Sequence, residues 1–162
     1  MSEINRETSA LYPPFGRLVG NFMSIWNSKN PLQTIGIFEG LRSFERQKEL
    51  YAQGRTVPGA IVTNAMPGFS WHQYGLAVDL VFDSDPVKPG LQATWDGKFP
   101  WKNMGKAGEF YGLEWAGSWK SFPEFPHFQK TWGMQLGEAR ELFEIGELQS
   151  VWNALNLTRQ TL

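Results

Sequence analysis

The only two histidines of this 162-residue chain, His72 and His127, lie close in sequence to carboxylates. His72 precedes Asp79 by seven residues, and Glu124 precedes His127 by three. An ionised carboxylate is costly to bury unless it is paired or binds a cation, and Asp79 lies in the apolar segment 76–82. Two imidazoles and one carboxylate leave a fourth tetrahedral position for water, as in catalytic zinc sites. We therefore expect His72, Asp79 and His127 to bind one Zn²⁺ ion.

Catalysis at such a site needs a group that accepts a proton from the bound water and later passes it to the leaving amine. Glu124 is the candidate. In a regular strand an offset of three would place Glu124 and His127 on opposite faces, so Glu124 must lie in a turn before the strand, and Pro126 makes that turn plausible. Glu114 is a rival base, because it lies on a possible strand near tryptophans.

Composition narrows the function classes. The chain has no cysteine, which excludes disulfide scaffolds, thiolate nucleophiles and zinc sites built on sulfur. Lys and Arg total 15 against 16 Asp and Glu, so no basic field attracts nucleic acid or anionic lipid. No apolar run reaches the roughly 20 residues that cross a bilayer, and the acidic start at 1–7 is unlike a secretory signal. We expect cytoplasmic synthesis without a signal peptide and no membrane insertion, so a substrate outside the membrane would require release or export by another factor.

Hydrophobic periodicity and turn residues indicate alternating helices and short strands. Ser43 is the expected N-cap of a helix that Gly54 ends, which places Arg42 at a strand-to-helix junction. Segments 54–70 and 83–100 are expected to be loops. The expected helices are 15–27, 43–54, 101–111 and two more beyond Gly133, and the expected strands are 33–40, 76–82, 113–116 and 127–129.

These elements predict an α+β fold with a small central antiparallel sheet flanked by helices. Repeats, low-complexity tracts and a convincing linker are absent from the sequence. We expect one domain over 1–162, with a motif-bearing core at about 33–130 and a helical C-terminal segment, 134–158, packed on it.

The segment Ser70-Trp71-His72-Gln73-Tyr74-Gly75-Leu76-Ala77-Val78-Asp79 resembles the Ser-x-His-x-x-Gly-x-Ala-x-Asp signature of the VanY-like D-alanyl-D-alanine carboxypeptidases and L-alanyl-D-glutamate endopeptidases. Glu124-Phe125-Pro126-His127 is similar to their second signature, and Arg42-Ser43 followed by Gln47 to their Arg-Ser-x-x-x-Gln segment. The resemblance implies that His72, Asp79 and His127 bind zinc and that Glu124 is the general base and acid. It also implies that Arg42, with Gln47 and Ser70, contacts the substrate.

The resemblance further implies a zinc-dependent peptidoglycan peptidase that cuts the stem peptide and acts on the cell wall after release or export by another factor. We expect an L-alanyl-D-glutamate endopeptidase of the phage or prophage endolysin type, acting as a monomer. D-alanyl-D-alanine carboxypeptidase activity is the close alternative. A non-catalytic cell-wall-binding domain and a non-haem iron oxygenase with a two-histidine, one-carboxylate triad also remain open.

Several of these residues also have purely structural interpretations. Arg42 could pair with Glu39 or Glu45 on the surface, Gln47 could be a solvated helix residue, and Ser70 could cap a local turn. Among the tryptophans, Trp26 and Trp152 fit the apolar faces of helices, whereas Trp115 and Trp119 are the candidates for lining a groove.

Overall fold

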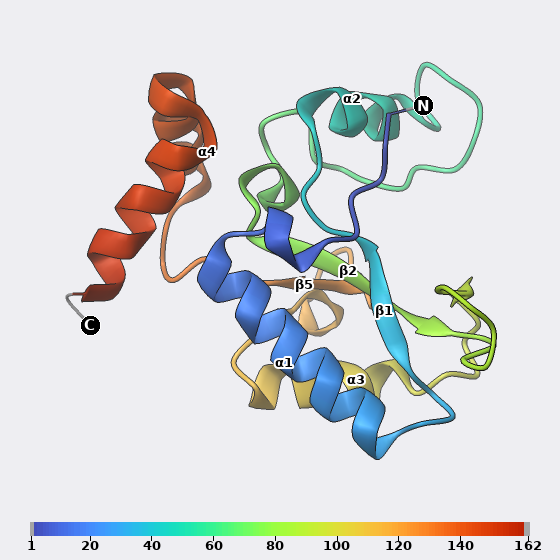
Figure 1. The fold of residues 1–162 in the computed structure, drawn as a ribbon. Helices are drawn as coiled ribbons and strands as arrows, with labels where there is room; N and C mark the ends of the chain where they lie inside the picture. Colours follow the sequence, from blue (N-terminus) through green and yellow to red (C-terminus); the bar gives the residue numbers. More distant parts are fainter. Residues whose placement is uncertain (1, 161–162) are drawn as a thin grey trace.

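The computed structural model describes residues 2–160 of the chain. Its elements alternate between helices and short strands (Figure 1). The helices are α1 (Pro13–Lys29), α2 (Phe44–Ala52), α3 (Trp101–Phe110) and α4 (Leu136–Gln160), with short 3₁₀ helices at Thr8–Ala10, Trp71–Tyr74 and Ala116–Ser118. The strands are β1 (Ile35–Glu39), β2 (Ala77–Asp83), β3 (Ala93–Thr94), β4 (Glu114–Trp115) and β5 (His127–Gln129).

The strands form one antiparallel sheet in the order β1-β2-β5-β4, with β3 also paired to β2. The predicted fold class, α+β with a small antiparallel sheet, is confirmed. The register places Glu39 of β1 opposite Asp79, and Asp79 opposite His127 of β5. Because directly paired residues point to the same face, three chemistry-bearing side chains form one row across the sheet.

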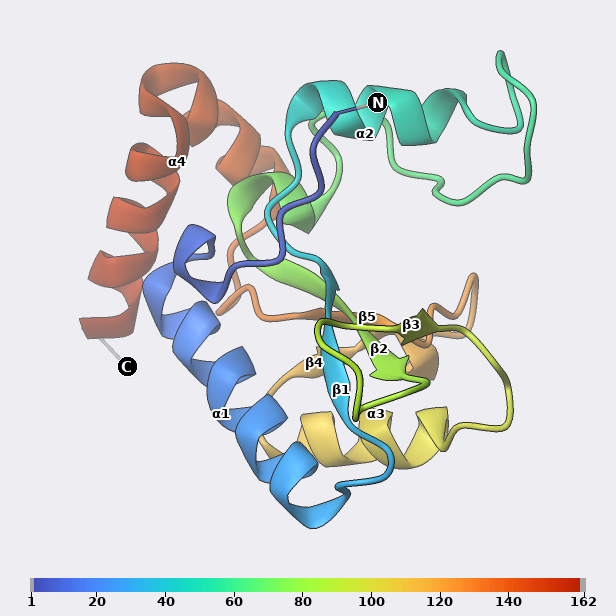
Figure 2. The ribbon, with the colours of Figure 1, turned by 45° about the vertical axis from the view of Figure 1, so that its right-hand side comes forward.

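Helices and aromatic side chains cover the sheet on the side away from that row. Helices α1 and α3 lie at one end of the molecule, and α2 with the long loop after it lies at the other end (Figures 1 and 2). Phe22 of α1 contacts the rings of Trp26 and Phe128, which joins α1 to β5. Gly105 of α3 lies so close to the Trp115 ring that a side chain would not fit there.

Most elements expected from the sequence are present with boundaries shifted by a few residues. Ser43 caps α2 as predicted, its Oγ accepting a hydrogen bond from Arg46 N at 3.0 Å. α4 is interrupted by non-helical backbone at Gly146 and Glu147, which matches the two C-terminal helices expected. The expectation of a loop throughout 83–100 was wrong at β3, since a two-residue strand is too short to leave a periodic pattern.

The described helices also bear on membrane insertion. Between residues 2 and 160, no helix is both long enough and apolar enough to cross a bilayer.

Gly75 makes the turn that links the histidine-bearing 3₁₀ helix to β2. Its φ of 70° lies in the left-handed region, which disfavours side chains. A Cβ at Gly75 would also approach Tyr12 N and Trp152 Cζ2 to 3.1 Å each. Gly75 therefore sets the direction in which the chain leaves His72 and enters β2.

Gly75→Ala should lower the free energy of unfolding, as measured by urea denaturation. Left-handed backbone costs a residue with a Cβ about 1–2 kcal/mol, and crowding against Tyr12 and Trp152 adds to this cost. Gly90→Ala is the matched control, because Gly90 has a similar φ of 76° but no atom within 4 Å of the added Cβ. Equal losses in the two variants would contradict the role of crowding at Gly75.

Candidate metal centre

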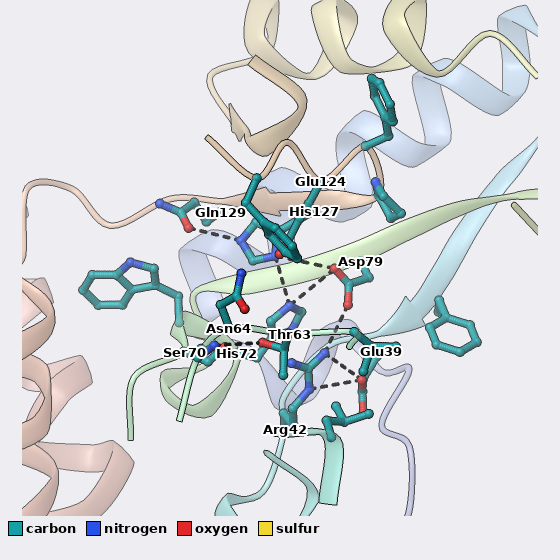
Figure 3. A pocket seen from close by; sticks show the side chains of 18 of the residues that line it. Glu39, Arg42, Thr63, Asn64, Ser70, His72, Asp79, Glu124, His127 and Gln129 are labelled. Atoms are coloured by element: carbon teal, nitrogen blue, oxygen red, sulfur yellow. Dashed lines mark hydrogen bonds and ion pairs between the residues drawn. The ribbon is translucent and has the colours of Figure 1, made fainter. Parts of the chain in front are cut away.

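Three side chains that are far apart in sequence converge on one point at the face of the sheet (Figure 3). His72 Nε2 lies 3.2 Å from His127 Nδ1. Asp79 Oδ1 lies 3.5 Å from each of these nitrogens. His72 comes from the 3₁₀ helix before β2, Asp79 from β2 and His127 from β5. The structure thus brings together the three residues that the sequence suggested as metal ligands.

The outer nitrogen of each imidazole is held by a hydrogen-bond acceptor. His72 Nδ1 lies 2.8 Å from the Gly40 carbonyl oxygen, and His127 Nε2 lies 3.1 Å from Gln129 Oε1. An N–H on each outer nitrogen donates to these acceptors, so the inner nitrogens, His72 Nε2 and His127 Nδ1, present lone pairs to each other. Together with Asp79 Oδ1, three electron-rich atoms face a common centre, which requires a proton or a cation between them.

The separations of these atoms fit a tetrahedral zinc ion. Ligand atoms that bind zinc at about 2.0–2.1 Å with tetrahedral angles lie roughly 3.3 Å from one another. The three edges of the His72, Asp79 and His127 triangle are 3.2, 3.5 and 3.5 Å. The donor set, two imidazoles and one carboxylate, also leaves one position free for water or substrate.

A buried ion-pair network orients Asp79 from the opposite side. Arg42 Nη2 donates to Asp79 Oδ2 at 3.1 Å and to Glu39 Oε2 at 2.7 Å. Glu39 also accepts from Arg46 Nε through its other oxygen, Oε1, at 3.0 Å. One carboxylate oxygen of Asp79 is thus fixed by Arg42, which directs the other oxygen, Oδ1, toward the two imidazoles.

The pKa values of the three candidate ligands reflect this arrangement. Burial, followed by the charge of Arg42, lowers the pKa of His72 and favours the neutral form that binds metals. Burial acts to raise the pKa of Asp79, but the charge of His72 and the hydrogen bonds of both histidines hold it well below its ordinary value. Burial acts to lower the pKa of His127, but the hydrogen bond to Asp79 and the negative charge of Asp79 outweigh burial and raise this pKa. The raised pKa of His127 reflects the attraction between positive charge and the carboxylates beside it.

Glu124 lies beside this cluster in the loop before β5, as the sequence predicted. Its Oε2 is 3.8 Å from His127 Nδ1, and its backbone carbonyl accepts from His127 N at 3.3 Å. Burial raises the pKa of Glu124, and the charge of His127 acts in the opposite direction. Glu124 is the carboxylate adjacent to the cluster that is not itself part of the triangle. Glu114, the rival base, is exposed on β4, where it accepts from Gln129 Nε2 at 3.1 Å.

The three residues expected to contact substrate occupy different positions. Arg42 and Ser70 line the cleft in front of the cluster, whereas Gln47 is fully buried behind it and accepts from Arg42 Nη1 at 2.9 Å. Gln47 is therefore neither solvated nor in the cleft wall. Arg42 does pair with Glu39, but in the interior rather than on the surface. Ser70 makes no side-chain cap, so its hydroxyl remains available at the wall of the cleft.

The cleft has a volume of about 1000 Å³ and extends well beyond the cluster. Thr63 and Asn64, from the loop between α2 and β2, face the cluster across it (Figure 3). Trp119 lines the cleft with its ring centroid 5.6 Å from that of His127, as expected for a groove residue. The same expectation was wrong for Trp115, which is 5% exposed and packs in the core.

Sequence reasoning missed Arg46 and Gln129, and it placed the pairing of Arg42 with Glu39 on the surface. Glu39 accepts from both Arg42 and Arg46, and Gln129 Oε1 lies 3.1 Å from His127 Nε2. The strand register could have indicated Glu39, because a carboxylate at the end of β1 opposite a buried aspartate needs a cation between them. Trp95, which also lines the cleft, had no signal of this kind, since it follows a strand that the sequence did not predict.

Comparisons with known proteins agree with this geometry. The D-alanyl-D-alanine carboxypeptidase family matches residues 63–130, which include all three candidate ligands and Glu124. Over this segment the chain is similar to that peptidase family. The peptidoglycan L-alanyl-D-glutamate endopeptidase CwlK of Bacillus subtilis is 43% identical over 101 residues, which are 57% of this chain and 58% of that protein. The chain thus spans less than two thirds of this curated relative.

Solved structures of similar fold support the same relationship. The L-Ala D-Glu endopeptidase ChiX of Serratia marcescens is 25% identical with a TM-score of 0.52, covering 78% of this chain and 84% of that one. The vancomycin resistance D,D-dipeptidase VanXYg, solved with a D-Ala-D-Ala phosphinate analogue, is 21% identical with a TM-score of 0.50. The match covers 85% of this chain and 56% of VanXYg, and it shows similarity of fold alone.

The buried network around Glu39 should control metal affinity. Glu39→Gln removes the charge that holds Arg42 against Asp79, so we expect zinc affinity to fall by about 10- to 100-fold. Competition with a chelating dye measures this change. Glu45→Gln is the control, because the side chain of Glu45 is 75% exposed and far less constrained.

Thermal unfolding of the metal-free variants separates a folding defect from a change at the centre. An unaltered zinc affinity in Glu39→Gln, with the fold intact, would show that Asp79 needs no support from this network.

Proposed function

We propose that the chain is a zinc-dependent peptidase that cleaves the stem peptide of peptidoglycan between L-alanine and D-glutamate. The observation that carries the proposal is the convergence of two imidazole nitrogens and one carboxylate oxygen at tetrahedral separations, with Glu124 beside them. The similarity to two proteins described as L-alanyl-D-glutamate endopeptidases supports the choice of bond.

In this proposal His72, Asp79 and His127 hold one zinc ion. Bound zinc would act as a Lewis acid and lower the pKa of a water molecule toward about 7. Glu124 accepts the proton of the attacking water and donates it to the departing amine, a role suited by its partly buried position and raised pKa. The protein thereby supplies both the site and the proton shuttle.

Arg42 holds Asp79 and also reaches the substrate. Four of the five N–H groups of a guanidinium are used here, by Glu39, Gln47 and Asp79, which leaves one at Nη1. That group and the Ser70 hydroxyl are the donors offered to a substrate carbonyl or carboxylate. Gln47 acts through Arg42, because its side chain is buried behind the guanidinium.

Glu124→Gln should abolish turnover while zinc remains bound. The amide keeps the shape of the side chain but cannot accept the proton, so we expect kcat to fall by at least about 10²-fold. Metal analysis of the purified variant, together with a peptidoglycan digestion assay, measures both properties. Loss of zinc from this variant would instead identify Glu124 as a ligand and overturn its assignment as the base.

Digestion of purified peptidoglycan tests the scissile bond. New amino groups on D-glutamate, identified by mass spectrometry, are the expected product. Release of D-alanine would instead indicate a D-alanyl-D-alanine carboxypeptidase, the second candidate, which the family similarity favours. A chelator should stop either reaction, because both use the same three ligands.

The remaining alternatives make different predictions for the same preparation. A non-catalytic cell-wall-binding domain would bind peptidoglycan without releasing new termini, and it would have no use for Glu124 beside the cluster. An iron oxygenase would contain Fe(II) and consume oxygen. An endolysin role predicts chelator-sensitive loss of turbidity in cells whose outer membrane has been permeabilised.

A further inference from the structure

A second, smaller groove opens directly beside the cleft of the candidate metal centre. Its volume is about 450 Å³, and it shares Trp95, Phe125 and Pro126 with the cleft wall. Its other lining residues are Gly97, Phe99, Pro100, Trp101, Lys102 and Asn103. Because Phe125 lies between Glu124 and His127 in sequence, a ligand in this groove would adjoin the reacting groups.

The strand register explains why the two hollows meet. Thr94 of β3 is opposite Phe82, and His127 of β5 is opposite Asp79, so β3 and β5 follow each other along the same edge of β2. Trp95 and Pro126 therefore come to the short stretch of β2 between these two pairings, where Leu80 N donates to the Pro126 carbonyl at 2.8 Å. β1 occupies the other edge of β2, and Figure 2 shows β3 and β5 near each other.

The groove exposes large aromatic surfaces. Trp95 is 53% exposed and Phe125 is 39% exposed. Packing nonetheless fixes the orientation of the Trp95 ring, which lies edge-on against Phe38 with centroids 4.7 Å apart. Exposed apolar groups that gather in a hollow mark binding surfaces rather than random surface variation.

The polar side chains of the groove indicate which kind of ligand it suits. Lys102 and Asn103, at the start of α3, are exposed, and their side chains have no hydrogen-bond or ion-pair partner within residues 2–160. No carboxylate lines this groove. Aromatic faces combined with amide and ammonium donors suit a sugar ring, which presents apolar C–H faces together with hydroxyl and acetamido oxygens.

We propose that the groove of Trp95, Phe125 and Asn103 binds the N-acetylated sugar to which the stem peptide is attached. This inference rests on the proposed function. In peptidoglycan the nitrogen of L-alanine is bonded to the lactyl group of the sugar, and one extended residue spans only about 3.5 Å. A peptidase that cuts after L-alanine must therefore accommodate the sugar next to its cleft, whereas one that removes the terminal D-alanine would not.

Steady-state kinetics on two substrates test the proposal. One substrate is the stem peptide carrying its disaccharide, and the other is the same peptide without sugar. We expect the wild-type protein to have a kcat/KM about tenfold higher for the sugar-bearing substrate. Trp95→Ala should lower the ratio of the two kcat/KM values to near one. This ratio is the readout because Trp95 also lines the cleft, so its removal affects both substrates.

Two further variants distinguish loss of the sugar site from a folding defect. Asn103→Ala removes an exposed, unpartnered side chain and should weaken the preference for the sugar-bearing substrate by a few fold. Phe110→Ala is the matched control, because Phe110 lies on the same helix, is 85% exposed and lines neither hollow. An equal loss on both substrates in Trp95→Ala, or a wild-type protein without preference, would overturn the proposal.

Binding of peptide-free glycan chains to the Glu124→Gln variant separates this inference from the peptidase assignment. Chemical-shift changes of Trp95 and Asn103 on addition of these chains support the sugar site even if neither peptide is cleaved. Cleavage after L-alanine without glycan binding would overturn the sugar site and leave the proposed activity intact.

Discussion

The mutual repulsion of three electron-rich atoms is the constraint on which this structure depends. His72 Nε2, His127 Nδ1 and Asp79 Oδ1 lie within 3.5 Å of one another, and outer hydrogen bonds to Gly40 and Gln129 keep the imidazole lone pairs facing inward. Such a cluster is unfavourable without a positive charge at its centre. The raised pKa of His127 reflects this demand for positive charge, and a zinc ion would satisfy it with tetrahedral geometry.

The small sheet serves mainly to align this cluster with its support. Glu39, Asp79 and His127 are neighbours in one row across β1, β2 and β5. Backbone pairing therefore fixes the two candidate ligands, Asp79 and His127, relative to the supporting carboxylate of Glu39. His72 joins from outside the sheet through the turn at Gly75. A rigid scaffold of paired strands holds such a constellation more accurately than loops would.

Much of the fold and the central triad could be predicted from sequence, because periodic apolar positions and paired signatures are local properties. Ser43, which caps the start of α2, and Gly112, whose positive φ follows the end of α3, are local signals of this kind. The support could not be read in the same way. Glu39 comes to lie between Arg42 and Arg46 only after folding, and Gln47, expected to contact substrate, is fully buried. Trp115 and Trp119 are close in sequence, yet tertiary packing buries only the first.

The candidate ligands and the residues of the neighbouring groove come from different segments of the chain. The candidate ligands belong to β2, β5 and the 3₁₀ helix Trp71–Tyr74, whereas Trp95 belongs to a separate excursion of the chain between β2 and α3. Insertions or deletions in that excursion can reshape the neighbouring hollow while the ligand triangle stays in register. Exchange of this one connection would therefore change what the hollow can accommodate and leave the three candidate ligands in place.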